Sequence, residues 1–231
     1  MSLTVKNILY ILIFFASILL YSLCTLAQNL VPNPGFDNIY NGKHSISPWT
    51  KINTIDFFVE SNNNAVENDS IIDKNYILPH AHSSPACIGL RVQNNYREFI
   101  QVKLSLPLIK GHHYHFEMYY LPAEHCKYYI RSLGVSFYNT KLSYASDNIV
   151  KKYPPQIFFY FKKGLQGDNG NWGKLSSEYY ADGGEQYITI GSFLNNKKES
   201  IVSKKFRLFH PSIREAYIYI DDISLIDMDS Q

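Results

Sequence analysis

The sequence predicts an all-β fold, an antiparallel β-sandwich, from three observations. Apolar and polar residues alternate with a period of two in several segments, and no segment carries a sustained helical stripe. Aromatic residues make up 15% of the chain, with Tyr 19 and Phe 14, and aromatic side chains favour strands. Many strands separated by turn signals are typical of a sandwich or a jelly roll.

The clearest predicted strands lie on either side of Gly111. Residues 100–106 and 114–120 both alternate, so we expect an antiparallel hairpin or its equivalent across two sheets. Only Pro122–Tyr129 could hold a helical turn. The other predicted strands are, in chain order, Asp56–Glu60, Cys87–Val92, Ser132–Tyr138, Gln156–Phe161, Leu175–Ala181, Gln186–Phe193 and Ala216–Ile226.

The last predicted strand does not keep one parity. Ile218 and Ile220 are separated from Ile223 and Leu225 by an odd step, which falls at Asp221–Asp222. A β-bulge at this step would keep all four apolar side chains on one face and let both carboxylates leave the ladder.

The N-terminus predicts export. Lys6 precedes a long apolar run, and small residues stand at the positions that a cut after Ala27 requires, so residues 1–27 are expected to be a signal peptide. The remaining 231 − 27 = 204 residues, 28–231, are expected to form a single domain. The expected location is the periplasm, the outer-membrane surface or the medium.

Charge and hydropathy exclude two classes of partner. Without Lys6 the chain has 22 − 1 = 21 basic residues against 20 acidic ones. Nucleic-acid binding requires a basic stripe, so nucleic acid is not expected as the main partner. No apolar run after the signal is long enough to span a bilayer.

Two cysteines remain after the predicted cleavage, Cys87 and Cys126. An even count in an exported chain favours one disulfide. The alternative is two buried free thiols, which behave as small apolar side chains.

Both ends of the predicted domain carry motifs of a known fold family. Residues 29–37 read NLVPNPGFD and residues 217–225 read YIYIDDISL, and both resemble the first and last strands of galactose-binding-like jelly rolls, including several carbohydrate-binding modules. Residues 96–101, YREFIQ, and 181–191, ADGGEQYITIG, resemble a narrower group of exported Bacteroidetes envelope proteins. In that group the module often precedes an outer-membrane-protein-A-like domain. The sequence ends at Gln231, where no such domain is expected.

The resemblance implies a structural calcium ion. Related jelly rolls hold calcium where the first and last strands meet, and the matching positions here are Asp37 and Asp222. Two carboxylates and turn carbonyls could supply the oxygen ligands that calcium needs. Alternatively, both acids are hydrogen-bonded to the backbone of a turn and a bulge.

Aromatic side chains are the second candidate for a ligand site. Sugars have apolar ring faces, so flat aromatic rings flanked by polar side chains make a binding platform. The alternative is that these rings fill the core. The expected ligand-binding residues are Trp172, Trp49, Tyr119, Tyr180, Asp182 and Arg97, of which Trp172 lies in a glycine-rich loop.

Histidines could also converge. His113 and His115 share one strand face, and His80 and His82 could share another, so four imidazoles would bind zinc or copper if the two segments met. The alternative is that these are solvated strand residues.

We expect no catalysis. The sequence has no Gly-x-Ser-x-Gly nucleophile motif. Glu98, Glu117, Asp182 and Glu185 could pair as acid and base for glycoside hydrolysis, but Glu98 and Glu185 could equally be buried partners of Arg97 or of backbone amides.

The sequence therefore favours a non-catalytic exported module that binds a glycan. A structural or protein-interaction module of an envelope complex is the alternative, and a glycan-active hydrolase is a third hypothesis. Calcium is the expected cofactor.

Overall fold

The computed structural model describes residues 28–60, 80–83, 85–93, 96–124, 126–143, 151–167, 170–194, 200–204 and 213–230. The predicted signal peptide lies outside these ranges. Within them no helix is long and apolar enough to cross a membrane.

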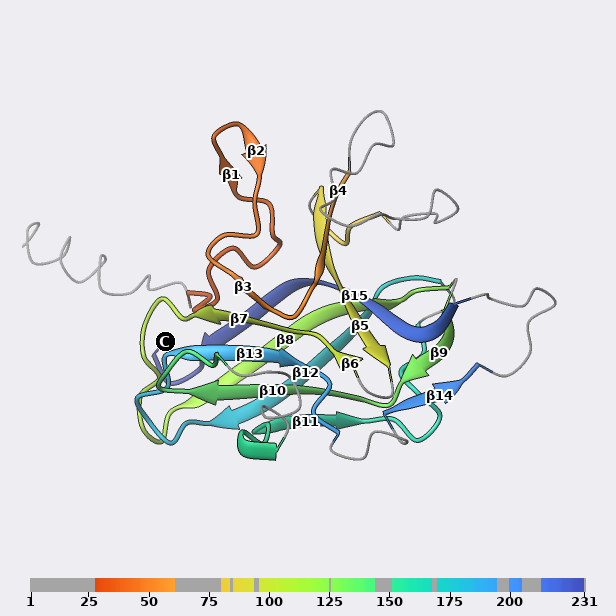
Figure 1. Cartoon of the computed structure of the whole chain (residues 1–231). Helices are drawn as coiled ribbons and strands as arrows, with labels where there is room; N and C mark the ends of the chain where they lie inside the picture. Colours follow the sequence, from red (N-terminus) through yellow and green to blue (C-terminus); the bar gives the residue numbers. More distant parts are fainter. Residues whose placement is uncertain are drawn as a thin grey trace, which may run out of the picture.

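Two antiparallel sheets pack face to face, and the hairpin of β1 and β2 stands out from them (Figure 1). The five-stranded sheet has the order β11 (Ile157–Tyr160), β10 (Ser132–Tyr138), β13 (Tyr187–Gly191), β7 (Phe99–Lys103) and β3 (Thr50–Ile52). The eight-stranded sheet has the order β12 (Gly173–Tyr180), β8 (His113–Pro122), β15 (Ile213–Asp227), β5 (Ala86–Gln93) and β4 (Asp56–Val59). The short strands β6 (Tyr96–Arg97), β9 (Cys126–Ile130) and β14 (Ile201–Ser203) complete the eight-stranded sheet, with β6 beside β5, β9 beside β15 and β14 beside β9. The hairpin consists of β1 (Ile39–Tyr40) and β2 (Lys43–His44).

The chain passes repeatedly from one sheet to the other. β3 and β4, β7 and β8, and β12 and β13 are neighbours in the sequence but belong to opposite sheets. This connectivity makes the predicted antiparallel sandwich a jelly roll. The turn at Gly111, with φ 79°, therefore joins the two sheets. Of the two predicted arrangements, the connection across two sheets is confirmed and the hairpin is wrong.

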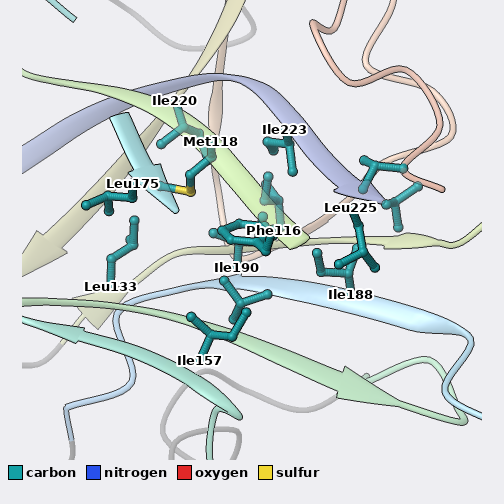
Figure 2. Packing of buried hydrophobic residues seen from close by; sticks show 14 of the residues in the cluster. Phe116, Met118, Leu133, Ile157, Leu175, Ile188, Ile190, Ile220, Ile223 and Leu225 are labelled. Carbon is teal, nitrogen blue, oxygen red and sulfur yellow. The ribbon is translucent and has the colours of Figure 1, made fainter. Parts of the chain in front are cut away.

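The core lies between the inner faces of the two sheets (Figure 2). Phe116, Met118 and Ile220 project from the eight-stranded sheet and face Ile188 and Ile190 of the other, and all five are at most 1% exposed. Alternation in β8 places its other side chains on the outer face of the eight-stranded sheet, which is the face that carries the candidate site.

The predicted strands are confirmed, with small differences at their ends, whereas the helical turn at Pro122–Tyr129 is wrong. β8 continues to Pro122, and Cys126–Ile130 forms β9. β9 pairs in parallel with β15 and antiparallel with β14. Strand partners from distant parts of the chain override the weak local helical preference here.

The predicted bulge is confirmed. The register between β15 and β8 shifts between Asp221 and Ser224, and Asp222 has a φ of 46°. The shift keeps Ile220 and Ile223 on the core side, where both are 0% exposed.

A buried carboxyl group stands at the start of β7. Glu98 is 0% exposed. Its carboxylate accepts hydrogen bonds from the Arg91 backbone N–H at 2.6 Å, the Tyr96 hydroxyl at 2.8 Å and the Thr54 hydroxyl at 3.2 Å. Burial raises the pKa of Glu98 to about 7, because the charged form loses its hydration.

The substitution Glu98→Gln should therefore change how stability depends on pH. A carboxyl whose pKa is raised in the folded state makes the protein less stable as pH rises from its ordinary value of 4.5 to about 7. Glutamine keeps the shape and does not ionise, so the variant should gain up to about 3 kcal/mol relative to wild type between about pH 4 and about pH 8. Chemical denaturation at both pH values measures the difference. The exposed Glu124→Gln is the control, and an equal effect of Glu98→Gln at both pH values would contradict the raised pKa.

A candidate ligand-binding face on strands β8 and β12

The outer face of β8 and β12 carries an unbroken row of polar and aromatic side chains. The two strands pair antiparallel, with Tyr180 opposite His113 and Glu178 opposite His115. Leu175 and Tyr179 point into the core and are 8% exposed. The side chains on the outer face are His113, His115, Glu117 and Tyr119 from β8, and Lys174, Ser176, Glu178 and Tyr180 from β12.

One end of this face is an exposed aromatic ring. Tyr180 is 67% exposed, and its ring stacks on the His113 imidazole with centroids 4.7 Å apart and an interplanar angle of 12°. The imidazole supports one face of the tyrosine ring and leaves the ring available to a ligand.

The middle of the face is a network of ion pairs. His115 Nδ1 lies 2.5 Å from Glu178 Oε1, and Lys174 Nζ donates to Glu117 Oε1 at 2.5 Å. His113 Nε2 lies 2.7 Å from Glu178 Oε2, an electrostatic contact without hydrogen-bond geometry.

These contacts shift the pKa values in opposite directions. The hydrogen bond from His115 lowers the pKa of Glu178, and the same contact raises the pKa of His115. The hydrogen bond from Lys174 lowers the pKa of Glu117. The carboxylates are thus held in their charged form, in which they accept hydrogen bonds from a ligand.

The other end of the face is a cluster of three rings. The His82 imidazole stacks on Tyr119 with centroids 3.6 Å apart and an interplanar angle of 19°. The Trp172 ring meets the same imidazole edge-on at 5.9 Å, and its Nε1 donates to the His80 carbonyl at 2.9 Å. Tyr119 and Trp172 are both half-buried.

The bulge in β15 holds this cluster in place. His82 Nδ1 lies 2.5 Å from Asp222 Oδ2, and the Ser83 hydroxyl donates to Asp222 Oδ1 at 2.6 Å. The backbone N–H of His82 donates to Asp221 Oδ2 at 2.9 Å. Burial raises the pKa of Asp221 to about 7, and the neighbouring charge of Asp222 adds to the shift.

The two aromatic ends are separated by the length of a small oligosaccharide. From His113 to Tyr119 the strand advances six residues, or about 20 Å. The rings at both ends offer stacking surfaces. The carboxylates, imidazoles and amine between them offer hydrogen-bonding groups along the same line.

Three of the expected ligand-binding residues lie on this face, with Tyr180 at one end and Tyr119 and Trp172 at the other. Asp182 is exposed in the turn after β12, and its N–H donates to Glu185 Oε1 at 2.9 Å. The side chain that sequence reasoning missed as a ligand-face residue is His82, because its contacts with Tyr119 and Asp222 join segments far apart in the chain.

Trp49 and Arg97 were expected to contact a ligand, and their burial corrects that expectation. Trp49 is 4% exposed, packs on Phe36 with ring centroids 5.5 Å apart, and donates from Nε1 to the Asn33 carbonyl at 2.9 Å. Arg97 is 2% exposed and donates from Nη2 to the Ser200 hydroxyl at 2.8 Å.

The other predicted groups are placed as follows. Asp37 is exposed, whereas the Asp222 carboxylate accepts hydrogen bonds from the chain itself, so calcium at this pair stays a prediction. Cys87 and Cys126 are buried free thiols in one apolar cluster with Phe58, Tyr217 and Tyr219, which is the alternative to the predicted disulfide.

The four histidines do not form the zinc or copper site considered above. His82 stacks on Tyr119 and His115 pairs with Glu178. The cluster of three metal-ligating side chains found in the described ranges lies elsewhere, at His112, Asp227 and Asp229.

Comparison with known proteins gives solved structures alone. No family model and no curated protein matches the chain. TmCBM61 in complex with β-1,4-galactotriose is similar at 14% identity and a TM-score of 0.43, covering 87% of this chain and 99% of that one. The K1 cleaved adhesin domain of Lys-gingipain from Porphyromonas gingivalis W83 is similar at 11% identity and a TM-score of 0.45, covering 84% and 95%.

A third match is the CBM22-1 xylan-binding domain of Paenibacillus barcinonensis Xyn10C, at 10% identity and a TM-score of 0.42, covering 88% of this chain and 97% of that one. Likeness of this size says nothing about what the present chain binds.

The ion-pair network predicts an altered titration of His115. Its pKa should lie above the ordinary value of 6.5, because the hydrogen bond to Glu178 favours the imidazolium. Glu178→Gln should lower it towards that value, as followed by NMR titration of the imidazole protons. The pairing then stabilises the fold at low pH, and this contribution is lost as pH rises through the raised pKa. Ser176→Ala, on the same face, should leave the titration unchanged, and a wild-type pKa of 6.5 would refute the network.

Proposed function

We propose that the protein is an exported, non-catalytic module that binds a carbohydrate on the outer face of β8 and β12. The observation that carries the proposal is the line of side chains from the exposed Tyr180 ring to the Tyr119, His82 and Trp172 cluster. Export rests on the predicted signal peptide.

The chemistry of this face suits a sugar chain. The apolar face of a pyranose ring stacks on an aromatic side chain, and its hydroxyl groups both donate and accept hydrogen bonds. Glu117 and Glu178 offer charged acceptors, and Lys174 offers a charged donor, so hydroxyls of either role find partners. Because the face is an open strand surface, it suits a chain that lies along it.

The burial of two of the four carboxyl groups considered for acid–base catalysis supports a non-catalytic module. Glu98 is 0% exposed and Glu185 is 4% exposed. Glu185 accepts hydrogen bonds from the Tyr179 hydroxyl at 2.5 Å and from the backbone N–H of Gly183 at 2.8 Å. These two carboxyl groups accept hydrogen bonds from the protein itself.

A glycan array followed by pull-down with the polysaccharides that it identifies tests the proposal. Tyr180→Ala and Trp172→Ala should each weaken binding by about tenfold, the effect of losing one stacking contact. The matched control is Tyr160→Ala, because Tyr160 is 49% exposed but lies on β11 of the other sheet.

The outcomes separate the hypotheses. Equal losses with Tyr160→Ala would place the ligand elsewhere. If the wild-type protein bound none of the glycans, with or without calcium, the proposal would be overturned and a protein-interaction module would be favoured. The exposed β1–β2 hairpin, with Ile39 at 68% and Tyr40 at 71% exposure, would then be the first surface to test.

A further inference from the structure

We infer that His112, Asp227 and Asp229 form a binding site for a divalent transition-metal ion, with zinc as its occupant. The three side chains each offer a ligand atom, and these atoms lie within 4.8 Å of one another. The site does not depend on the proposed glycan face, and it is distinct from the calcium pair expected at Asp37 and Asp222.

The spacing of His112 and Asp227 suits a shared ion. His112 Nδ1 lies 2.9 Å from Asp227 Oδ2. Zinc binds nitrogen and oxygen ligands at about 2.0–2.2 Å, which places adjacent donors about 2.9–3.5 Å apart at octahedral or tetrahedral angles. An ion could therefore bridge His112 and Asp227 in place of the hydrogen bond between them.

Two strands far apart in the sequence fix the three donors. His112 stands immediately before β8, and Asp227 is the last residue of β15, which pairs with β8 through Tyr114. Asp229 Oδ2 accepts the backbone N–H of His113 at 2.7 Å, and the Met228 N–H donates to the His113 carbonyl at 2.9 Å. Because strand pairing and these hydrogen bonds already hold the ends of β8 and β15 together, binding an ion costs little ordering entropy.

The donor set selects the class of metal. One imidazole nitrogen and two carboxylates favour zinc or a similar transition metal, since magnesium and calcium prefer oxygen ligands alone. The side chains of His112 and Asp227 are 29% and 12% exposed, and Asp229 is exposed. The ion can therefore enter from solvent, and three protein ligands leave a position for water or for a ligand group.

Isothermal titration calorimetry of the metal-free protein with zinc chloride tests the site. We expect one bound zinc that is retained by His80→Asn, because the His80 side chain is 97% exposed and lies outside the cluster. His112→Asn and Asp229→Asn should each weaken zinc binding by at least about tenfold. Calcium should bind at least tenfold more weakly than zinc.

Cobalt provides a second measurement that distinguishes a built site from a loosely held surface ion. Co²⁺ bound to the wild-type protein should give visible absorption bands that disappear in His112→Asn, while circular dichroism shows that the variant is folded. Zinc binding that His112→Asn and Asp229→Asn leave unchanged, or that His80→Asn abolishes, would overturn the inference.

Discussion

The bulge at Asp221–Asp222 is the constraint on which the fold and the candidate site both depend. β15 lies in the middle of the eight-stranded sheet, between β8 and β5, and four of its side chains face the core, namely Ile218, Ile220, Ile223 and Leu225. The odd step in its sequence permits this only if the register shifts, and the positive φ of Asp222 makes the shift. Alternation already places Asp221 on the outer face of the sheet, and the shift directs the Asp222 carboxylate to the same face.

Those carboxylates organise the surface above them. Burying a carboxylate without hydrogen-bond partners would destabilise the fold. Asp221 accepts a hydrogen bond from the backbone N–H of His82, and the Asp222 carboxylate contacts the His82 imidazole. These contacts hold the imidazole stacked on the Tyr119 ring, and Trp172 Nε1 donates a hydrogen bond to the neighbouring His80 carbonyl. A constraint of core packing thus sets the position of the rings that we propose as one end of the glycan face.

The alternation of apolar and polar residues made the strands, the core face and the bulge predictable from the sequence. The period of two in β8 separates the core from the outer face, and the parity break in β15 locates the bulge. Sequence could not show that Trp49 is buried, since an aromatic after a proline looks the same in a core and in a loop. Nor could it show that Cys126–Ile130 is a strand, because its partner β15 lies far along the chain. His82 meets Tyr119 and Asp222 only through tertiary packing.

The dependence of the face on the carboxylate at the bulge is tested most directly by the NMR shifts of the His82 ring protons in wild type and in Asp222→Gly. Glycine tolerates the positive φ, so the variant loses the carboxylate and keeps the backbone. In wild type the protons should be shifted upfield by the Tyr119 ring, and in the variant they should return to solvent-exposed values. The His113 protons, stacked on Tyr180, should stay unchanged. Identical His82 shifts in the two proteins would show that the Asp222 carboxylate does not hold His82 on Tyr119.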